Sequence, residues 1–244
     1  MNDLDLEVSA RIALYGQDEK LKLEAQHFMQ STVDAQYSYN FNWMGRPIIQ
    51  YPQDIVAMHE IIWSVQPDLI IETGVAHGGS LIFSAAMLEL NAVCGGPPDA
   101  EVLGIDIDIR AHNRVAIEGH PMSKRISLIQ GSSISPNVIS QVKAKASDRK
   151  RVLVCLDSNH TYDHVIAELH AYASLTSVGS YCVVFDTVID DLQVHPERPW
   201  GPGNSPKTAV REYLTTHPEF EVDKRIGDKL LLSVAPEGFL KRIN

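Results

Sequence analysis

Residues 69–80 read LIIETGVAHGGS and contain the most informative pattern of the chain. It passes from a short apolar run rich in isoleucine through a glycine-rich turn into a helical pattern. Glycines at such a junction let the backbone turn sharply and approach a ligand closely beneath a helix N-terminus. The spacing Gly74-x-x-x-Gly78 differs from the G-x-G-x-x-G of dinucleotide binders. For the loop alone, a tight turn without a ligand is the purely structural alternative.

On both sides of this stretch, short apolar runs alternate with helical patterns. The predicted strands are residues 68–72, 101–106, 126–130, 151–156 and 180–185, and the clearest helical patterns are 80–91, 137–146 and 162–175. This alternation, with strands that are almost continuously apolar, predicts a parallel sheet covered on both faces. A further helix is expected to start at Pro52 and to end at Pro67, because proline suits a first helical turn and breaks a helix interior.

The end of the chain has a different pattern. Residues 220–226 alternate, and Gly227-Asp228 separates them from a second apolar run at 229–234. A two-residue Gly-Asp connection between two strand patterns predicts an antiparallel hairpin. Five parallel strands and this hairpin make a seven-stranded, mostly parallel sheet. That α/β, Rossmann-like arrangement is the layout of class I S-adenosylmethionine methyltransferases.

Composition limits the class of protein. The 244 residues include 44% apolar side chains and carry a net charge of −10, which suits a globular protein and argues against binding nucleic acid through phosphate neutralisation. No apolar run approaches the roughly 20 residues that span a bilayer. The acidic N-terminus and three cysteines without metal-type spacing predict a cytoplasmic protein.

We expect residues 51–244 to form the methyltransferase domain, preceded by an N-terminal helical or lid segment at residues 1–50. One amphipathic helix is predicted at 13–29, and the aromatic, Asn- and Pro-rich residues 36–52 are interpreted as a loop over a pocket. A cap packed on the core, or a subunit contact, is the alternative for this segment. Its apolar and aromatic character would suit a homo-oligomer.

Acidic residues after the first two strands favour S-adenosylmethionine as the cofactor. Its ammonium and sulfonium groups suit an acid such as Glu72, whereas a pyrophosphate would not. Asp106, with Asp108 as second choice, would accept both hydrogens of a ribose diol. Ser133 follows the third strand, where the adenine end would lie. The predicted cofactor contacts are Glu72, Gly74, Ala76, Gly78, Ser80, Asp106, Ser133 and Asp157.

Two aspartates follow the fourth and fifth strands, Asp157 and Asp186. Ligands of open α/β sheets bind at the carboxyl ends of the strands, and Mg²⁺ is commonly held by a few carboxylates and water. Asp157 could instead cap the following helix. His160, three residues on, could remove a hydroxyl proton as the catalytic base. A zinc pair of His160 and His164 would lack a third soft ligand.

On these residues the chain resembles the cephalosporin hydroxylase family, typified by the cephamycin-pathway methyltransferase, from about residue 40 to 243. The most specific motifs are residues 71–80, 104–108 with 112–114, 156–160, 184–187, 198–209 and 228–236. The resemblance implies O-methylation of a specialised metabolite or sugar, as in antibiotic and other natural-product biosynthesis. It does not imply an iron oxygenase, which would need a facial triad that is not legible in the sequence.

The predicted pocket is also similar to that of catechol O-methyltransferase, a divalent-metal enzyme. That likeness assigns Asp157 and Asp186 as metal ligands and puts His160 at the position of its catalytic lysine. It places Thr187 where that enzyme has a third ligand, an asparagine, so that Asp190 or Asp191 would have to reach in if the threonine does not serve.

The proline-rich residues 190–204 are interpreted as a loop over the acceptor, with His195 and Trp200 as substrate contacts and Trp43 and Gln50 lining the same pocket. A rigid connection to the last helix is the alternative. Two other functions stay open on the sequence: an NAD-type oxidoreductase, and a non-catalytic cofactor-binding subunit that assists a partner enzyme.

Overall fold

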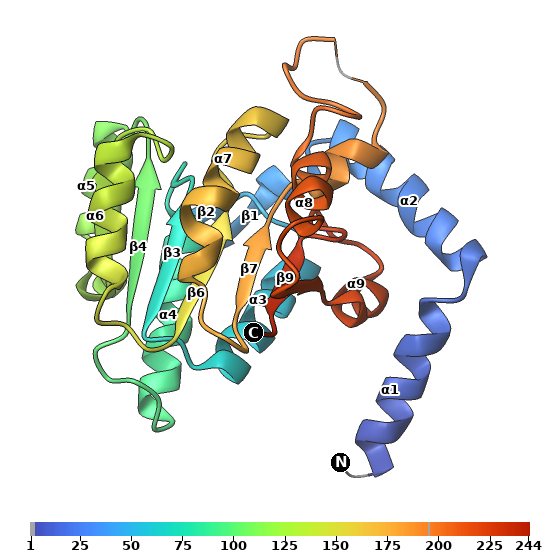
Figure 1. Ribbon diagram of the computed structural model, residues 1–244, viewed down its shortest axis with the longest axis horizontal. Coiled ribbons are helices and arrows are strands. Elements are labelled where there is room, and N and C mark those ends of the chain that lie inside the picture. Colours follow the sequence, from blue (N-terminus) through green and yellow to red (C-terminus); the bar gives the residue numbers. More distant parts are fainter. Residues whose placement is uncertain (1–2, 195) are drawn as a thin grey trace.

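The central sheet has the strand order β5-β4-β3-β6-β7-β9-β8 in the computed structural model, which describes residues 3–194 and 196–244 (Figure 1). Its strands are β3 (Leu69–Thr73), β4 (Glu101–Asp106), β5 (Ile126–Gln130), β6 (Val152–Leu156), β7 (Tyr181–Val184), β8 (Phe220–Val222) and β9 (Phe239–Arg242). The first five are parallel, and β9 runs antiparallel to both β7 and β8. The predicted seven-stranded, mostly parallel fold is therefore confirmed.

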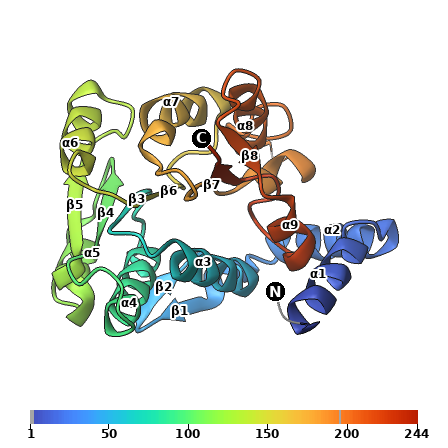
Figure 2. The same ribbon diagram turned by 60° about the horizontal axis from the view of Figure 1, so that its bottom comes forward.

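Helices cover both faces of the sheet (Figure 2). On one face lie α3 (Pro52–Val65), α4 (Gly79–Val93) and α5 (Ala111–Glu118), and on the other α6 (Pro136–Ala146), α7 (Tyr162–Tyr172) and α8 (Pro206–Leu214). Successive strand residues alternate between the two cores: Ile70 packs into the first, and Ile71 into the second. Both faces of the central strands are buried, which is why their sequences are almost continuously apolar.

The register brings the carboxyl ends of the strands to one edge. Thr73 at the end of β3 pairs with Ile105 of β4 and Leu156 of β6. The residues that follow these strands therefore meet above the same edge, as expected for ligand sites in open α/β sheets.

The predicted Gly227-Asp228 hairpin turn is wrong, although the antiparallel ending is right. Gly227 and Asp228 lie within α9 (Lys224–Leu230), a short helix whose N-cap, Asp223, accepts a hydrogen bond from the Arg225 amide. The last strand begins only at Phe239. A capping aspartate followed by helix-forming residues outweighs the local strand pattern.

The N-terminal segment also differs from its prediction. The single helix expected at 13–29 is two helices, α1 (Asp3–Tyr15) and α2 (Glu19–Asp34), because Asp18 caps the second by accepting from the Leu21 amide at 3.0 Å. Residues 36–52 are more regular than a loop: they hold the 3₁₀ turn η1 (Tyr37–Asn40) and a hairpin of β1 (Phe41–Trp43) and β2 (Arg46–Ile48).

The hairpin packs on the start of α4, where a side chain at Gly79 would come within 2.1 Å of the Pro47 carbonyl oxygen. In Figure 1, α1 and α2 lie at the opposite end of the molecule from α5 and α6. The remaining described elements are the 3₁₀ turns η2 (Pro121–Arg125), η3 (Ala173–Leu175) and η4 (Thr187–Asp191). Within the described ranges, no helix combines the length and apolar character that a membrane crossing needs.

Candidate active site

A cavity of about 790 Å³ opens at the carboxyl ends of the strands. One part of its wall is formed by the glycine loop after β3, residues 74–80, together with Asp106; we call this the loop half. The other part comes from the cavity-lining residues of 33–51 and 188–201, including Trp200; we call this the Trp200 half. Asp157, Ser158, His160, Asp186 and Val234 complete the lining. A volume of this size suits a small molecule with its cofactor.

The glycine loop has a left-handed backbone at three positions. Gly74 (φ +90°) lies so close to the next loop that a Cβ there would be 2.0 Å from the Asp157 carbonyl oxygen, so only glycine fits. Gly78 (φ +82°) and Ala76 (φ +44°) have the same handedness. For alanine this backbone is strained, and such strain persists where the surroundings hold the loop.

Asp106 is one of the groups that hold the loop. Its Oδ2 accepts hydrogen bonds from the amides of Val75 at 2.8 Å and Ala76 at 3.3 Å, and its Oδ1 accepts from the Asp108 amide at 2.9 Å. Asp106 lines the cavity, as the sequence predicts, whereas Asp108 is exposed and lies outside the described lining. The carboxylate can therefore serve both the loop and a ligand.

Arg46 and Asn113 hold the loop from its other side. The Arg46 guanidinium donates to the His77 carbonyl oxygen, at 3.0 Å from Nε and 2.5 Å from Nη2, and to Asn113 Oδ1 at 3.0 Å. Asn113 Nδ2 donates to the Ala76 carbonyl oxygen at 2.8 Å. Sequence reasoning missed this pair, because Arg46 belongs to the β1–β2 hairpin and nothing local to it indicates a partner in the glycine loop.

Besides Asp108, four of the predicted cofactor and metal residues lie outside the described lining of the cavity: Glu72, Gly78, Ser133 and Thr187. Glu72 is buried and accepts a hydrogen bond from the hydroxyl of Ser80, which does line the cavity. Burial raises the pKa of the Glu72 carboxyl to about 7, although bonds from Ser80 and Ser84 oppose the rise. Glu72 therefore lies behind Ser80, which separates it from the cavity. Gly74, Ala76 and Ser80 line the cavity as expected.

Ser133 belongs to a buried polar group behind the wall. Its hydroxyl contacts His164 Nε2 at 3.1 Å, and the same nitrogen lies 3.2 Å from the Ser158 hydroxyl. Ser158 also donates to the buried Glu168 at 2.7 Å. His164 is therefore engaged away from His160, so the structure does not form the zinc pair.

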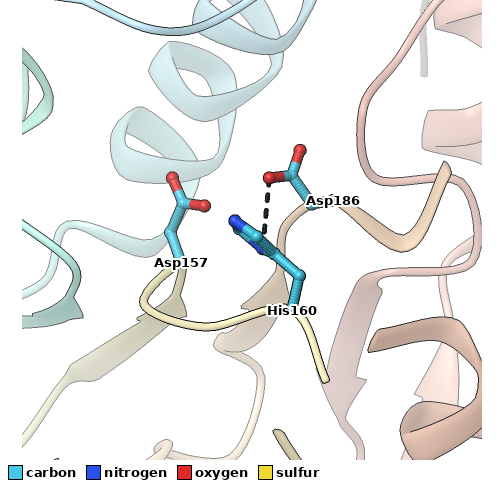
Figure 3. Close-up of side chains that lie close together, drawn as sticks. All are labelled: Asp157, His160 and Asp186. Carbon is cyan, nitrogen blue, oxygen red and sulfur yellow. Dashed lines mark ion pairs between the residues drawn. The ribbon is translucent and has the colours of Figure 1, made fainter. Parts of the chain in front are cut away.

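Asp157, His160 and Asp186 form the central cluster (Figure 3). One ligand atom from each lies within 4.8 Å of the others, and His160 Nδ1 is 3.3 Å from Asp186 Oδ2. Asp157 follows β6, and Asp186 follows β7 with a left-handed backbone (φ +56°). Burial raises the pKa of the Asp157 carboxyl well above its usual range, and the neighbouring Asp186 carboxylate adds to the rise. A cation or a proton between the two aspartates would relieve this repulsion.

The residues after Asp186 point elsewhere. The buried Thr187 hydroxyl donates to the Pro236 carbonyl oxygen at 2.6 Å. Asp190 accepts from the Gly203 amide and the Ser205 hydroxyl, both at 2.8 Å, and Asp191 pairs with Lys207. The structure thus brings Asp157, His160 and Asp186 together, but not the third ligand that the likeness to catechol O-methyltransferase placed at Thr187.

Trp200 stands beside the cluster in the Trp200 half. Its ring meets the His160 ring edge to face, with centroids 4.7 Å apart, and the Arg198 guanidinium lies 5.3 Å from its centre. His195, the other predicted substrate contact, lies outside the described residues. Trp43 packs edge to face on Phe83 and is absent from the described lining, which does include Gln50.

Residues 188–201 contact helix α2 just before the lining residues 33–51, since the Gln193 amide donates to Gln30 Oε1 at 3.0 Å. Gln36, Ser38 and Tyr39 line the cavity and lie in the stretch 36–52 that the sequence places over a pocket. The lining residues Val33 and Asp34 lie before that stretch, at the end of α2, where no local pattern marks them.

Comparison with known proteins identifies the relatives of the chain. The model of the family "Rhamnosyl O-methyltransferase/CmcI" matches residues 35–243. The rhamnosyl O-methyltransferase of Mycobacterium tuberculosis is 30% identical over 206 residues, covering 82% of this chain and 77% of that protein. Its counterpart in Mycobacterium leprae is 29% identical over 204 residues, with 82% of each covered.

Solved structures agree in fold. A structure of CmcI with Mg and SAM has a TM-score of 0.60 at 19% identity, covering 84% of this chain and 78% of that one. An O-methyltransferase from Bacillus cereus in complex with SAH has a TM-score of 0.52 at 14% identity, covering 84% and 82%. The resemblance expected from the sequence motifs is confirmed.

Proposed function

Because the chain belongs to the rhamnosyl O-methyltransferase/CmcI family and is an S-adenosylmethionine-dependent O-methyltransferase, we propose that it methylates a hydroxyl of a sugar or small specialised metabolite at the junction of the two halves of its cavity. The observation that carries this is the Asp157–His160–Asp186 cluster, which lies between the glycine loop and Trp200. S-adenosylmethionine would occupy the loop half, and the acceptor the Trp200 half.

The loop half suits the cofactor because its groups are already fixed. Asp106 retains capacity for the ribose hydroxyls, and Ser80 presents the hydroxyl that Glu72 holds. The cofactor supplies an activated methyl group when it is bound. The chain must then hold the acceptor oxygen in line with that methyl group, at about 3 Å, which can lower the barrier by several kcal/mol.

His160 is proposed as the base that removes the acceptor proton. Its Nδ1 faces Asp186 Oδ2, which favours the tautomer with the hydrogen on Nδ1 and leaves Nε2 free to accept a proton. Figure 3 shows the second ring nitrogen directed toward the Asp157 side of the cluster. Asp186 would also stabilise the imidazolium that forms, because opposite charges favour the charged histidine.

Asp157 and Asp186 are proposed to hold a magnesium ion. Two carboxylates separated by a few ångströms, one of them destabilised by burial and by the other, fit a divalent cation with oxygen preference. Bound there, the ion would act as a Lewis acid on the acceptor hydroxyl. The CmcI structure that holds Mg and SAM supports this assignment by analogy of fold.

The nature of the acceptor is inferred from the relatives and from the wall. The curated relatives are rhamnosyl O-methyltransferases, and Trp200 with its polar neighbours Gln36, Ser38 and Gln193 offers a flat apolar face and hydrogen-bonding groups. Sugars present both kinds of surface. We therefore place a deoxyhexosyl hydroxyl first among acceptors and a hydroxylated natural product second.

The test is a methyl-transfer assay with S-adenosylmethionine, Mg²⁺ and a panel of rhamnosides and hydroxylated natural products, read by the mass of the product. Methylation of a rhamnoside supports the proposal. Tight cofactor binding without turnover on any member of the panel would favour the non-catalytic subunit instead. The family match and the glycine spacing already favour the methyltransferase over an NAD-type oxidoreductase.

Residues 1–50 are proposed to act as a lid and subunit-contact segment attached to the methyltransferase domain at 51–244. Support comes from the lining residues on this segment and from the exposed apolar side chains Leu4, Leu6, Leu14, Leu23 and Phe28 on α1 and α2. Exposed side chains of this kind suit a homo-oligomer. Light scattering of the intact chain, compared with a variant carrying serines at these five positions, would test it: a loss of mass in the variant is the expected result.

A further inference from the structure

We propose that Gln50 supplies a neutral oxygen ligand to the cation held by Asp157 and Asp186, and so completes the metal site from the N-terminal segment. This inference rests on the magnesium site of the proposed function. Gln50 would thus be the third ligand of the cation, in place of Thr187, whose hydroxyl is bound to the Pro236 carbonyl oxygen.

The Gln50 side chain is buried at the wall of the cavity beside the cluster. It is only 7% exposed, it lines the cavity, and its Nε2 donates to Asp157 Oδ2 at 3.4 Å. Its Oε1 is buried without a hydrogen-bond partner in the described part of the chain. A buried amide oxygen without a partner costs free energy, so such an atom calls for a ligand or another explanation.

The backbone around Gln50 is fixed by its neighbours. Ile48 and Tyr51 are 2% and 1% exposed, and the Tyr51 hydroxyl lies 2.8 Å from Thr32 Oγ1. Gln50 therefore has little freedom except at its amide end. A half-turn about the last side-chain bond exchanges Oε1 with Nε2, which brings the oxygen to the position that now faces Asp157.

Other oxygens of the neighbourhood are already engaged. Thr187 donates to the Pro236 carbonyl oxygen, Asp190 accepts from Gly203 and Ser205, and Asp191 pairs with Lys207. An uncharged amide oxygen also suits the local charge, because the two carboxylates already balance a divalent cation.

A purely structural role for Gln50, in which Nε2 only steadies Asp157, predicts different behaviour from its variants. If the amide oxygen is a ligand, Gln50→Leu loses it and Gln50→Glu replaces it with a stronger, charged one. If the amide is only a donor to Asp157, both variants lose the same hydrogen bond, and Gln50→Glu adds repulsion. The two roles therefore differ in the sign of the effect of Gln50→Glu.

The experiment is a titration of the intact protein with Mn²⁺ as the probe, with the free ion followed by electron paramagnetic resonance. We expect Gln50→Leu to weaken Mn²⁺ binding by about tenfold, the range for loss of a group that supports a metal site, and Gln50→Glu to bind at least as tightly as the wild type. Gln53→Leu is the matched control: Gln53 also has a buried, unpartnered Oε1 but lies outside the described lining, so its change should leave Mn²⁺ affinity unaltered.

The affinity for S-adenosylmethionine, measured by calorimetry on each variant, shows that the variants are folded. Mn²⁺ binding by the wild type with no loss in Gln50→Leu, or weaker binding by Gln50→Glu, would overturn the role of Gln50 and leave the proposed function standing. Absence of Mn²⁺ binding in the wild type would overturn both the cation site and this inference, while cofactor binding and methyl transfer would still be measured separately.

Discussion

The two halves of the cavity are built differently. The loop half comes from consecutive elements, β3, the glycine loop, α4 and the end of β4, and backbone groups make most of its contacts. The Trp200 half is assembled from residues 33–51 and 188–201, which come together only in the folded chain, where Gln193 also contacts Gln30 of α2. Cofactor affinity should therefore depend on residues of the loop half and acceptor affinity on residues of the Trp200 half. Turnover should depend on the Asp157–His160–Asp186 cluster at the boundary between them.

The largest expected effect is on kcat and comes from the cluster between the two halves of the cavity. His160→Ala should lower kcat by about 10²–10⁴-fold, the usual contribution of a general base, because His160 is the proposed proton acceptor. Cofactor affinity should change little, since His160 lies outside the loop half. Steady-state kinetics with calorimetry checks both. His170→Ala is the control, because His170 packs against Tyr213 and His217 away from the cavity. Undiminished turnover in His160→Ala would remove the base assignment.

The next effect concerns Asp54, a buried acid of α3. It accepts hydrogen bonds from the Ser233 hydroxyl at 2.6 Å and from the amide of Val234, a residue that lines the cavity, at 3.0 Å. Burial raises the pKa of Asp54 to about 7. From about pH 4 to 7 the folded protein keeps the Asp54 proton that the unfolded chain releases, so the contribution of Asp54 to the free energy of unfolding should fall as pH rises through this window and level off above it.

Asp54→Asn removes this titration while keeping the shape of the side chain. Its stability relative to the wild type should therefore rise between pH 4 and pH 7, by on the order of 2–4 kcal/mol. Urea unfolding at several pH values measures the difference. A difference that stays constant with pH would show that Asp54 does not hold its proton in the folded state.

Substitutions of Arg46, which contacts the glycine loop from the β1–β2 hairpin, test the role of the loop half in cofactor binding. Arg46→Ala should weaken S-adenosylmethionine binding by about 10–100-fold, the equivalent of the 1.5–3 kcal/mol typical of charge-assisted hydrogen bonds, while kcat at saturating cofactor changes less. Arg46→Lys should restore only part of the affinity, because an ammonium cannot span the His77 carbonyl and Asn113 as the guanidinium does. Calorimetry measures both variants. Equal loss of kcat and affinity would mean that Arg46 serves the whole site rather than the loop half.

Trp200 gives the smallest of these effects and tests the other half. Trp200→Ala should raise the acceptor KM by about tenfold, as expected for losing an aromatic contact of 0.5–1.5 kcal/mol plus its apolar area, and Trp200→Phe should raise it less. Cofactor affinity should stay unchanged. A weakened cofactor affinity with an unchanged acceptor KM would reverse the assignment of the two halves.

The same contrast decides how much could be predicted from the sequence. The five parallel strands and the placement of Asp106, Asp157 and Asp186 at one edge follow from local patterns and the rule for strand ends, and the structure agrees. The hairpin turn predicted at Gly227-Asp228 is wrong, because a short capped helix can have the same local sequence pattern as the end of a strand. Residues of the stretch 36–52 line the pocket, as its composition indicates. The contact of Arg46 with the glycine loop could not be predicted, since it is set by tertiary packing. Glu72 and Ser133 were placed near the cofactor by chain order, but burial puts them one layer behind the wall.

The central claim is that the boundary cluster serves transfer to the acceptor rather than binding of the cofactor. Its most direct test is single-turnover methyl transfer by the wild type with S-adenosylmethionine already bound, run with Mg²⁺ and again with EDTA, beside calorimetry of cofactor binding in both buffers. We predict similar cofactor affinity in the two buffers and a methyl-transfer rate that falls by about 100-fold or more with EDTA, in line with the several kcal/mol that a Lewis acid supplies. An unchanged rate in EDTA, or loss of cofactor binding with the metal, would contradict the claim.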